Sequence, residues 1–269
     1  MADLYQKEQR LIKQLADFGK LVVCYSGGVD STYLLALAMK SGVEVTAVTI
    51  KSESLTTQEL DQALVHAREL GTAPHVIEVE ELAEPKLAAN PTNRCYFCKQ
   101  ISYREICAFA QAQGTSVVVD GTNHDDLSDY RPGLKAKDEF GVSSPLAEAG
   151  LSKAEIRSLS RRLGLPTWDK PSSPCLNSRI PYGQPITTHK LDQIAGGEQF
   201  LRQLGFKDLR VRHHGDLARI EVPEGEISEV VKHKTQITKA FQKLGFLWVS
   251  VDLSGFQTGS LNRRLSVET

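Results

Sequence analysis

The apolar and polar positions alternate between strand-like and helix-like segments through the first half of the chain. Short runs rich in β-branched residues lie at 21–25, 44–50, 75–79 and 117–120. Longer segments with helical periodicity lie at 30–41, 57–70, 96–112 and 152–163. Ser152, with Glu155 three residues later, predicts a capping box at the start of the last of these helices. Strands separated by helices predict an α/β fold with a parallel, doubly wound sheet.

A different pattern begins after a proline-rich stretch at residues 165–185. A helix cannot continue through such a stretch, so it predicts an ordered loop or a connection between domains. Beyond it, the pattern predicts helices near 187–204 and 225–243 and strands near 208–214, 217–222 and 246–252. We therefore expect an N-terminal domain at 1–168 and a smaller α+β domain at 169–269.

Charge and hydropathy disfavour two classes of protein, general nucleic-acid binders and membrane-spanning proteins. The 269-residue chain has 32 Lys and Arg against 33 Asp and Glu, a formal charge of −1. This balance disfavours general nucleic-acid binding, because a basic surplus supplies most of that affinity. The apolar runs are strand-sized, well below the roughly 20 residues that span a bilayer. The first residues are charged and lack the apolar segment of a secretory signal, so we expect a cytoplasmic protein without a membrane partner.

The segment 26–31, Ser-Gly-Gly-Val-Asp-Ser, directly follows the first predicted strand and opens the first predicted helix. Its glycines allow a tight turn, and the amides at a helix start favour a phosphate chain. The hydroxyl groups of Ser26 and Ser31 can donate to phosphate oxygens. Asp30 would oppose an anion directly, so we assign it to Mg²⁺ that bridges phosphate oxygens. The segment lacks the Gly-Lys-Ser/Thr ending of a Walker A loop.

Ligands of doubly wound sheets bind at the carboxyl ends of the strands. Residues 50–54 and 120–123 follow two other predicted strands and would lie beside the same site. Asp125 and Asp126 come next, either as a further metal ligand or as solvated loop acids. The residues that we assign to ATP binding are Ser26, Gly27, Gly28, Asp30, Ser31, Ser52, Gly121 and Thr122.

Three of the five cysteines are candidates for chemistry. Cys24 and Cys107 lie in apolar or helical runs and are most simply small buried side chains. Cys95 and Cys98 are three residues apart at a helix start, and Cys175 lies in the proline-rich stretch. Three thiolates would leave one iron of a 4Fe–4S cluster open to bind sulfide or substrate. Two alternatives are zinc with a histidine as fourth ligand (His124, His189 or His214), and reactive thiols with Cys175 alone catalytic.

The 26–31 segment resembles the PP-loop, written SGGxDS, of the ATP pyrophosphatase superfamily, whose fold is adenine nucleotide alpha hydrolase-like. Within this superfamily, the chain resembles the LarE family, and the resemblance covers nearly the whole chain. The motifs that carry it lie at residues 120–123 (Asp-Gly-Thr-Asn), 129–133 (Asp-Tyr-Arg-Pro-Gly), 144–146 (Ser-Pro-Leu), 175–183, 210–216 and 259–262.

This resemblance implies an ATP-dependent sulfurtransferase of nickel-pincer nucleotide biosynthesis. Such an enzyme adenylates a carboxylate of pyridinium-3,5-biscarboxylic acid mononucleotide and replaces the activated oxygen with sulfur. In familiar members, the cysteine that matches Cys175 surrenders its own sulfur. The added Cys95–Cys98 pair departs from those members and resembles the subgroup in which a 4Fe–4S cluster carries the sulfide. The implied partners are the mononucleotide, a sulfide source and other enzymes of the pathway, and we expect a homo-oligomer.

The predicted C-terminal domain carries candidate anion-binding residues. A guanidinium fork matches phosphate oxygens, and Arg179, Arg210 and Arg212 could grip a substrate phosphate. Arg210 and Arg212 are two apart on a predicted strand and therefore share a face. The pair resembles the phosphate-gripping arginines of the family, and Glu198 matches a family acid associated with metal binding. The alternative for each arginine is a solvated position on a surface strand.

Other functions remain open at this point. A tRNA thiolase also combines a PP-loop with three cluster cysteines, but it would need an extended basic face. An amide-forming PP-loop enzyme would leave the three cysteines without a purpose. A catalytically silent sensor of ATP or of a cluster would release no pyrophosphate.

Overall fold

The computed structural model describes residues 2–128, 131–171 and 173–257. Part of one motif, residues 129–130, and the whole of another, residues 259–262, lie outside the described residues. The chain forms two compact units. Unit 1 comprises Met1–Leu87 and Asn93–Ser173, and unit 2 comprises Ala88–Thr92 and Pro174–Thr269.

Unit 1 is built on a parallel four-stranded sheet with the order β3-β2-β1-β4. The strands are β1 (Lys20–Cys24), β2 (Glu44–Lys51), β3 (His75–Glu78) and β4 (Val118–Val119). The helices are α1 (Ala2–Asp17), α2 (Val29–Lys40), α3 (Thr57–Glu69), α4 (Pro85–Ala88), α5 (Arg94–Ala112), α6 (Gly133–Glu139), α7 (Pro145–Glu148) and α8 (Lys153–Arg162). The predicted doubly wound α/β fold is confirmed.

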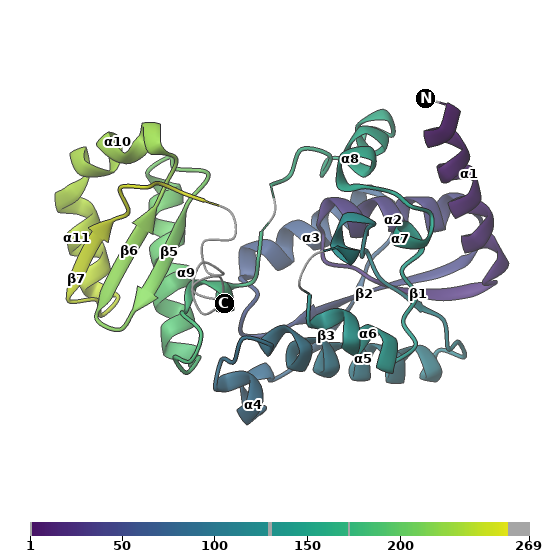
Figure 1. Ribbon diagram of the computed structural model, residues 1–269, viewed down its shortest axis with the longest axis horizontal. Coiled ribbons are helices and arrows are strands. Elements are labelled where there is room, and N and C mark those ends of the chain that lie inside the picture. Colours follow the sequence, from purple (N-terminus) through teal and green to yellow (C-terminus); the bar gives the residue numbers. More distant parts are fainter. Residues whose placement is uncertain (1, 129–130, 172, 258–269) are drawn as a thin grey trace. The chain divides into compact units, whose positions relative to one another are not determined.

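Strand β1 contributes to a core on each face of this sheet. Leu21 and Val23 belong to one buried cluster, which includes side chains of α1, α2 and α8. Val22 points the other way, into a cluster with Tyr103 and Ile106 of α5. Figure 1 shows α5 and α6 along one face of the sheet and α1, α2 and α8 along the other. Burial on both faces explains why β1 reads as a continuous apolar run.

Unit 2 contains a three-stranded sheet with the order β5-β6-β7. Strands β5 (Arg210–His214) and β6 (Leu217–Glu221) are antiparallel, whereas β7 (Trp248–Val251) runs parallel to β6. Helices α9 (Thr188–Gln203), α10 (Ile227–Lys232) and α11 (Lys234–Lys243) complete the unit. The sequence predicts one helix at 225–243, but His233, with ψ of 9°, leaves the helical conformation and separates α10 from α11.

Helix α1 is not among the elements predicted above. Its signal is nevertheless present, because Leu4, Leu11 and Leu15 recur at helical spacing and pack against the unit 1 core. Among the described residues, the structure contains no helix that is both long and apolar enough to cross a bilayer.

Candidate functional site

The PP-loop connects β1 to α2 in unit 1, and its glycines have different roles. Gly27 has φ of +66°, and a Cβ atom there would lie 2.5 Å from Cβ of Ala63. A side chain is therefore excluded by both conformation and space. Gly28 is the N-cap of α2 and has an ordinary extended conformation. The turn thus brings backbone amides and the positive end of α2 to the carboxyl end of the sheet, where a phosphate chain fits.

The two serines of the loop lie together. Ser26 Oγ is 3.0 Å from Ser31 Oγ, and the backbone amide of Ser26 donates to Ser31 Oγ at 3.2 Å. Ser31 Oγ also donates to the carbonyl of Gly28 at 3.3 Å. Because each hydroxyl can rotate, the pair can redirect its protons toward a bound anion.

The segment after β4 packs directly on this loop. A Cβ atom at Gly121 would lie 3.0 Å from the backbone nitrogen of Ser31. Buried Asp120 holds the segment in place: it accepts hydrogen bonds from Tyr103 Oη and Ser144 Oγ, each at 2.7 Å, and from Thr122 Oγ1 at 2.8 Å. Asp120 is therefore a structural carboxylate. The structure brings Gly121 beside the loop, as the sequence predicts for the end of a parallel strand, and Thr122 is held next to it by Asp120.

Asp30, the candidate Mg²⁺ ligand, lies in the first turn of α2. Its Oδ2 atom contacts the ammonium of Lys153, while its Oδ1 atom is buried without a hydrogen-bond partner in the described part of the chain. Burial raises the pKa of Asp30, although the charge of Lys153 acts in the opposite direction. A divalent cation would satisfy the orphaned oxygen, so the donor chemistry fits Mg²⁺.

The neighbouring acids of the predicted site have partners within the protein. Asp126 accepts the backbone amide of Asn123 at 3.0 Å and forms an ion pair with Arg131 at 2.7 Å. Asp125 accepts the backbone amide of Lys153 at 2.8 Å. These contacts give both side chains a role in holding the loop and the start of α8.

A buried glutamate that sequence reasoning missed connects the end of β2 with one of the candidate cysteines. Ser52 Oγ lies 3.1 Å from Ser54 Oγ, which donates to Glu81 Oε2 at 3.0 Å. The Cys98 thiol donates to the other oxygen of Glu81 at 3.2 Å. No motif marks Glu81, because its role depends on contacts with residues distant in the chain.

The cysteines of interest lie in different units. Cys95, which is exposed, and Cys98, which is half-buried, occupy the first turns of α5 in unit 1, where a spacing of three places them on one side of the helix. Cys175, which is exposed, precedes a short 3₁₀ segment in unit 2. All five cysteines are thiols rather than disulfides. Within the described ranges, no three His, Cys, Asp or Glu side chains form a group that could hold a metal.

Arg179 holds the backbone around Cys175. Its side chain is 2% exposed, and Nη1 donates to the carbonyls of Pro174 at 2.6 Å and Cys175 at 3.1 Å. Nε donates to Glu198 Oε1 at 2.8 Å. Burial acts to raise the pKa of Glu198, but the charges of Arg179 and other arginines outweigh it, and the pKa is lowered. Glu198 is thus an ionised partner of Arg179 in this structure.

The two strand arginines, Arg210 and Arg212, lie next to this pair. Arg212 donates to Glu221 at 2.7 Å and to the carbonyl of Ser178 at 2.8 Å. Arg210 stacks its guanidinium 5.0 Å from the Phe256 ring centre. Burial and then the charge of Arg179 lower the pKa of Arg210 to about 10. The close spacing of these arginines gives the region around the Cys175 loop a positive potential, which favours binding of an anion.

Within the described residues, none of the zinc candidates His124, His189 and His214 belongs to a group of three or more side chains that could hold a metal. His213, beside His214 on β5, is buried and bonds to Gln193 at 3.0 Å. Burial, followed by neighbouring cationic groups, lowers its pKa to about 4, so it is neutral at physiological pH. It acts as a hydrogen-bonding residue of the unit 2 core.

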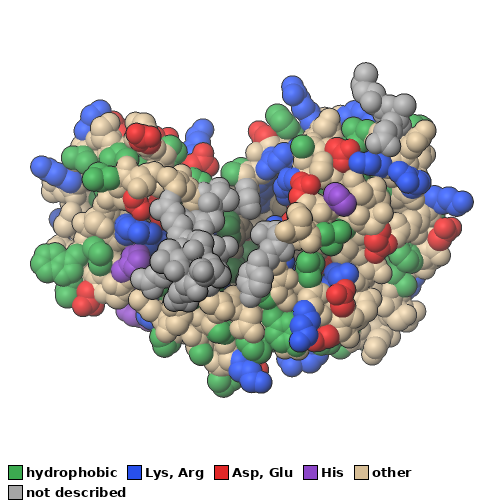
Figure 2. Space-filling view, in the orientation of Figure 1, with side chains coloured by type: hydrophobic (Ala, Val, Ile, Leu, Met, Phe, Trp, Pro, Cys, Tyr) green, Lys and Arg blue, Asp and Glu red, His purple; other side chains and the backbone are tan. Residues whose placement is uncertain are grey.

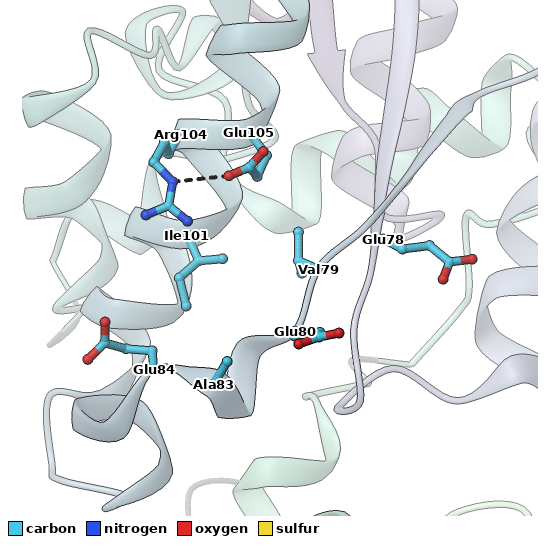
Figure 3. Close-up of a pocket in the computed structure, with 8 residues that line it drawn as sticks. All are labelled: Glu78, Val79, Glu80, Ala83, Glu84, Ile101, Arg104 and Glu105. Atoms are coloured by element: carbon cyan, nitrogen blue, oxygen red, sulfur yellow. Dashed lines mark hydrogen bonds and ion pairs between the residues drawn. The ribbon is translucent and has the colours of Figure 1, made fainter.

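A separate cavity of about 430 Å³ lies in unit 1, between the segment after β3 and one side of α5 (Figure 3). Arg104 and Glu105 pair with each other at its wall at 3.0 Å. Its lining is largely acidic, which opposes the binding of ATP, and it contains none of the predicted site residues. The lining residues are Glu78, Val79, Glu80, Ala83, Glu84, Ile101, Arg104 and Glu105.

Several known proteins are similar to this chain in sequence. The family profile described as queuosine biosynthesis protein QueC matches residues 20–94, which include the PP-loop. The uncharacterized protein slr1717 of Synechocystis sp. is 44% identical over 98% of this chain and 99% of its own length. The tRNA-specific 2-thiouridylase MnmA of Azorhizobium caulinodans is 28% identical over 61% of this chain and 53% of its own.

One further relative identifies the family. The pyridinium-3,5-bisthiocarboxylic acid mononucleotide synthase of Lactiplantibacillus plantarum is 38% identical over 268 residues, which cover 99% of this chain and 97% of the relative. This similarity extends through both units and includes the PP-loop. The chain therefore belongs to the LarE family of PP-loop enzymes and is an ATP-dependent sulfurtransferase.

Proposed function

We propose that this enzyme adenylates a carboxylate of pyridinium-3,5-biscarboxylic acid mononucleotide and converts it to a thiocarboxylate, in the biosynthesis of the nickel-pincer nucleotide. The observation that carries the proposal is the phosphate-binding turn at Gly27 in a chain that matches a synthase of the bisthiocarboxylic product over nearly its whole length. We assign ATP binding and adenylation to unit 1, and substrate binding and oligomerisation to unit 2.

The chemistry explains why ATP is needed. A carboxylate is a poor electrophile, because the group that leaves would be oxide. Transfer of AMP to one carboxylate oxygen releases pyrophosphate and creates a good leaving group. The loop amides offset the charge that develops on pyrophosphate, and Asp30 would hold Mg²⁺, which would supply further positive charge there. A sulfur nucleophile then attacks the activated carbon and displaces AMP.

For the substrate, we propose that the arginines of unit 2 bind its phosphate. Arg179 and Arg212 are each bonded to a buried glutamate and to the backbone of the loop that carries Cys175. Burial, followed by neighbouring cations, lowers the pKa of Arg210, and a phosphate dianion would relieve the repulsion among these cations. This arrangement supports substrate binding close to the Cys175 thiol.

For the sulfur, we propose that Cys95, Cys98 and Cys175 hold a 4Fe–4S cluster. Soft thiolates suit iron, and Cys95 and Cys98 are both thiols on one side of α5, so the donor chemistry fits. A cluster with three thiolate ligands keeps one iron open to carry sulfide. The partners would be a sulfide source and other enzymes of nickel-pincer nucleotide biosynthesis. The enzyme would act in the cytoplasm. Direct donation from exposed Cys175 is the second candidate.

A tRNA thiolase is a weaker proposal. The matching MnmA relative covers only part of this chain. On the face drawn in Figure 2, the Lys and Arg side chains are interspersed with Asp and Glu on both units, rather than forming an extended basic surface. A small mononucleotide substrate fits this charge distribution better than a polyanion.

The proposed function is tested by incubating the reconstituted protein with ATP, Mg²⁺, sulfide and the biscarboxylic mononucleotide. The expected product has the mass gain of one oxygen replaced by sulfur, together with AMP and pyrophosphate. The intact-protein mass separates the two sulfur sources: it stays constant if sulfide is carried by a cluster, and Cys175 loses H₂S if it donates its own sulfur. Absence of any thiolated mononucleotide with both sulfur sources available would contradict the proposal.

A further inference from the structure

Unit 1 contains a half-buried cation at the PP-loop, the ammonium of Lys170, that has no ion-pair partner among the residues which the structure describes. The ammonium of Lys170 donates to the carbonyl of Gly27 at 3.0 Å. This carbonyl is its one acceptor among the described residues, and Lys170 forms no ion pair within them. An ammonium has three N–H donors, and a desolvated charge is normally compensated by an opposite charge.

The backbone that carries Lys170 is held firmly near the loop. Arg157 of α8 donates from Nη2 to the carbonyl of Lys170 at 2.7 Å and from Nη1 to the carbonyl of Trp168 at 2.8 Å. The amide of Lys170 donates to the carbonyl of Thr167 at 3.1 Å. These contacts fix the backbone from which the Lys170 side chain extends to the loop.

The electrostatic surroundings of Lys170 indicate the charge of the ligand that would bind there. Burial lowers its pKa, and the charge of Glu59 offsets this effect only in part. Glu59 itself accepts hydrogen bonds from Thr56 and Ser173. The amides of the PP-loop, the start of α2 and the Lys170 ammonium all present positive potential at the same turn. An anion with several oxygens would satisfy them together.

We propose that Lys170 is a polyphosphate-binding residue of the ATP site, and that its ammonium contacts the phosphates which leave as pyrophosphate. This inference rests on the proposed function and adds to it a residue that no loop motif contains. Lys170 would neutralise charge on the leaving pyrophosphate, whereas the adenosine and α-phosphate would be held by other groups. The alternative is a purely structural role, in which Lys170 only caps the Gly27 carbonyl.

Chemical protection of the wild-type protein distinguishes these roles. Lysines are acetylated with and without α,β-methylene ATP, an analogue that cannot transfer its AMP group to the substrate. The modification of each lysine is followed by peptide mass spectrometry. We expect the ATP analogue to protect Lys170 strongly and AMP to protect it little. Lys7 is the control, because its ammonium donates to the carbonyl of Gly150 at 2.9 Å and pairs with Glu155 at 2.8 Å, and neither contact involves the loop. Equal modification of Lys170 with and without the analogue would overturn the proposal.

Substitution provides the second measurement. Lys170→Met should weaken binding of the ATP analogue about tenfold or more, the usual effect of losing a charged hydrogen bond, and should change AMP binding less than about twofold. Lys170→Arg should retain part of the affinity, and Lys7→Met should retain all of it. Unchanged affinity for the analogue in Lys170→Met would contradict the inference while leaving the proposed function intact. Failure of the wild type to bind the analogue would instead contradict the proposed function.

Discussion

At the scale of single residues, the PP-loop depends on one backbone conformation. Gly27 has φ of +66°, and the space beside it is filled by Ala63 of α3. Gly28, the next residue, has φ of −82°, and a Cβ atom there would lie 3.4 Å from Ser26 Oγ, an ordinary contact. Two adjacent glycines of the same motif therefore have unequal requirements.

Gly27→Ala should lower the stability of unit 1 by about 1–3 kcal/mol, because the new methyl group combines a strained φ with a clash. It should also nearly abolish substrate-dependent pyrophosphate release, since the loop amides would move. Thermal unfolding and a pyrophosphate assay measure the two effects. Gly28→Ala is the control and should lower stability by less, about 0.5–1 kcal/mol, because Gly28 is the N-cap of α2 and alanine caps a helix less well than glycine. Similar effects of both substitutions would contradict the role given to Gly27.

The residues of the site differ in how far the sequence predicts them. The loop at 26–31 is contiguous, so its glycines and serines are visible as a motif. Lys170 reaches Gly27 across 143 positions, and Glu81 reaches Cys98 across 17, so no local pattern marks either one. The phosphate-binding turn can therefore be predicted from sequence, whereas the surrounding charged groups require the fold.

At the scale of elements, local signals predict most of unit 1. The capping box at the start of α8 is confirmed: Ser152 accepts the backbone amide of Glu155, and Glu155 accepts the backbone amide of Ser152. Strand β4 is shorter than the predicted 117–120, because the amide of Asp120 instead donates to the carbonyl of Ser143. Such a contact between separate segments cannot be read from the local pattern.

Ser152→Ala should destabilise unit 1 by about 1 kcal/mol, since it leaves an amide of the first turn of α8 without its side-chain partner. The loss would appear in thermal or denaturant unfolding. Ser158→Ala is the matched control, because Ser158 is exposed in the middle of the same helix and alanine favours a helix. A neutral Ser152→Ala variant would mean that the capping box contributes nothing to the fold.

At the scale of the whole molecule, the two units are interleaved in sequence. Residues 88–92 belong to unit 2, where the Asn90 side chain donates to the carbonyls of Pro181 at 2.8 Å and Gln184 at 3.0 Å. Composition shifts do not predict this arrangement, because it depends on hydrogen bonds across some 90 positions. The chain thus passes through unit 2 shortly before it returns to unit 1 and the Cys95–Cys98 pair.

The central claim is that the enzyme transfers AMP from ATP to a carboxylate before sulfur enters. It is tested most directly with a mononucleotide whose carboxylate oxygens carry a heavy isotope. After turnover with ATP, Mg²⁺ and sulfide, mass spectrometry of the nucleotide products should find one labelled oxygen in AMP and none in pyrophosphate. Label in inorganic phosphate with formation of ADP, or AMP that carries no label, would contradict adenylation.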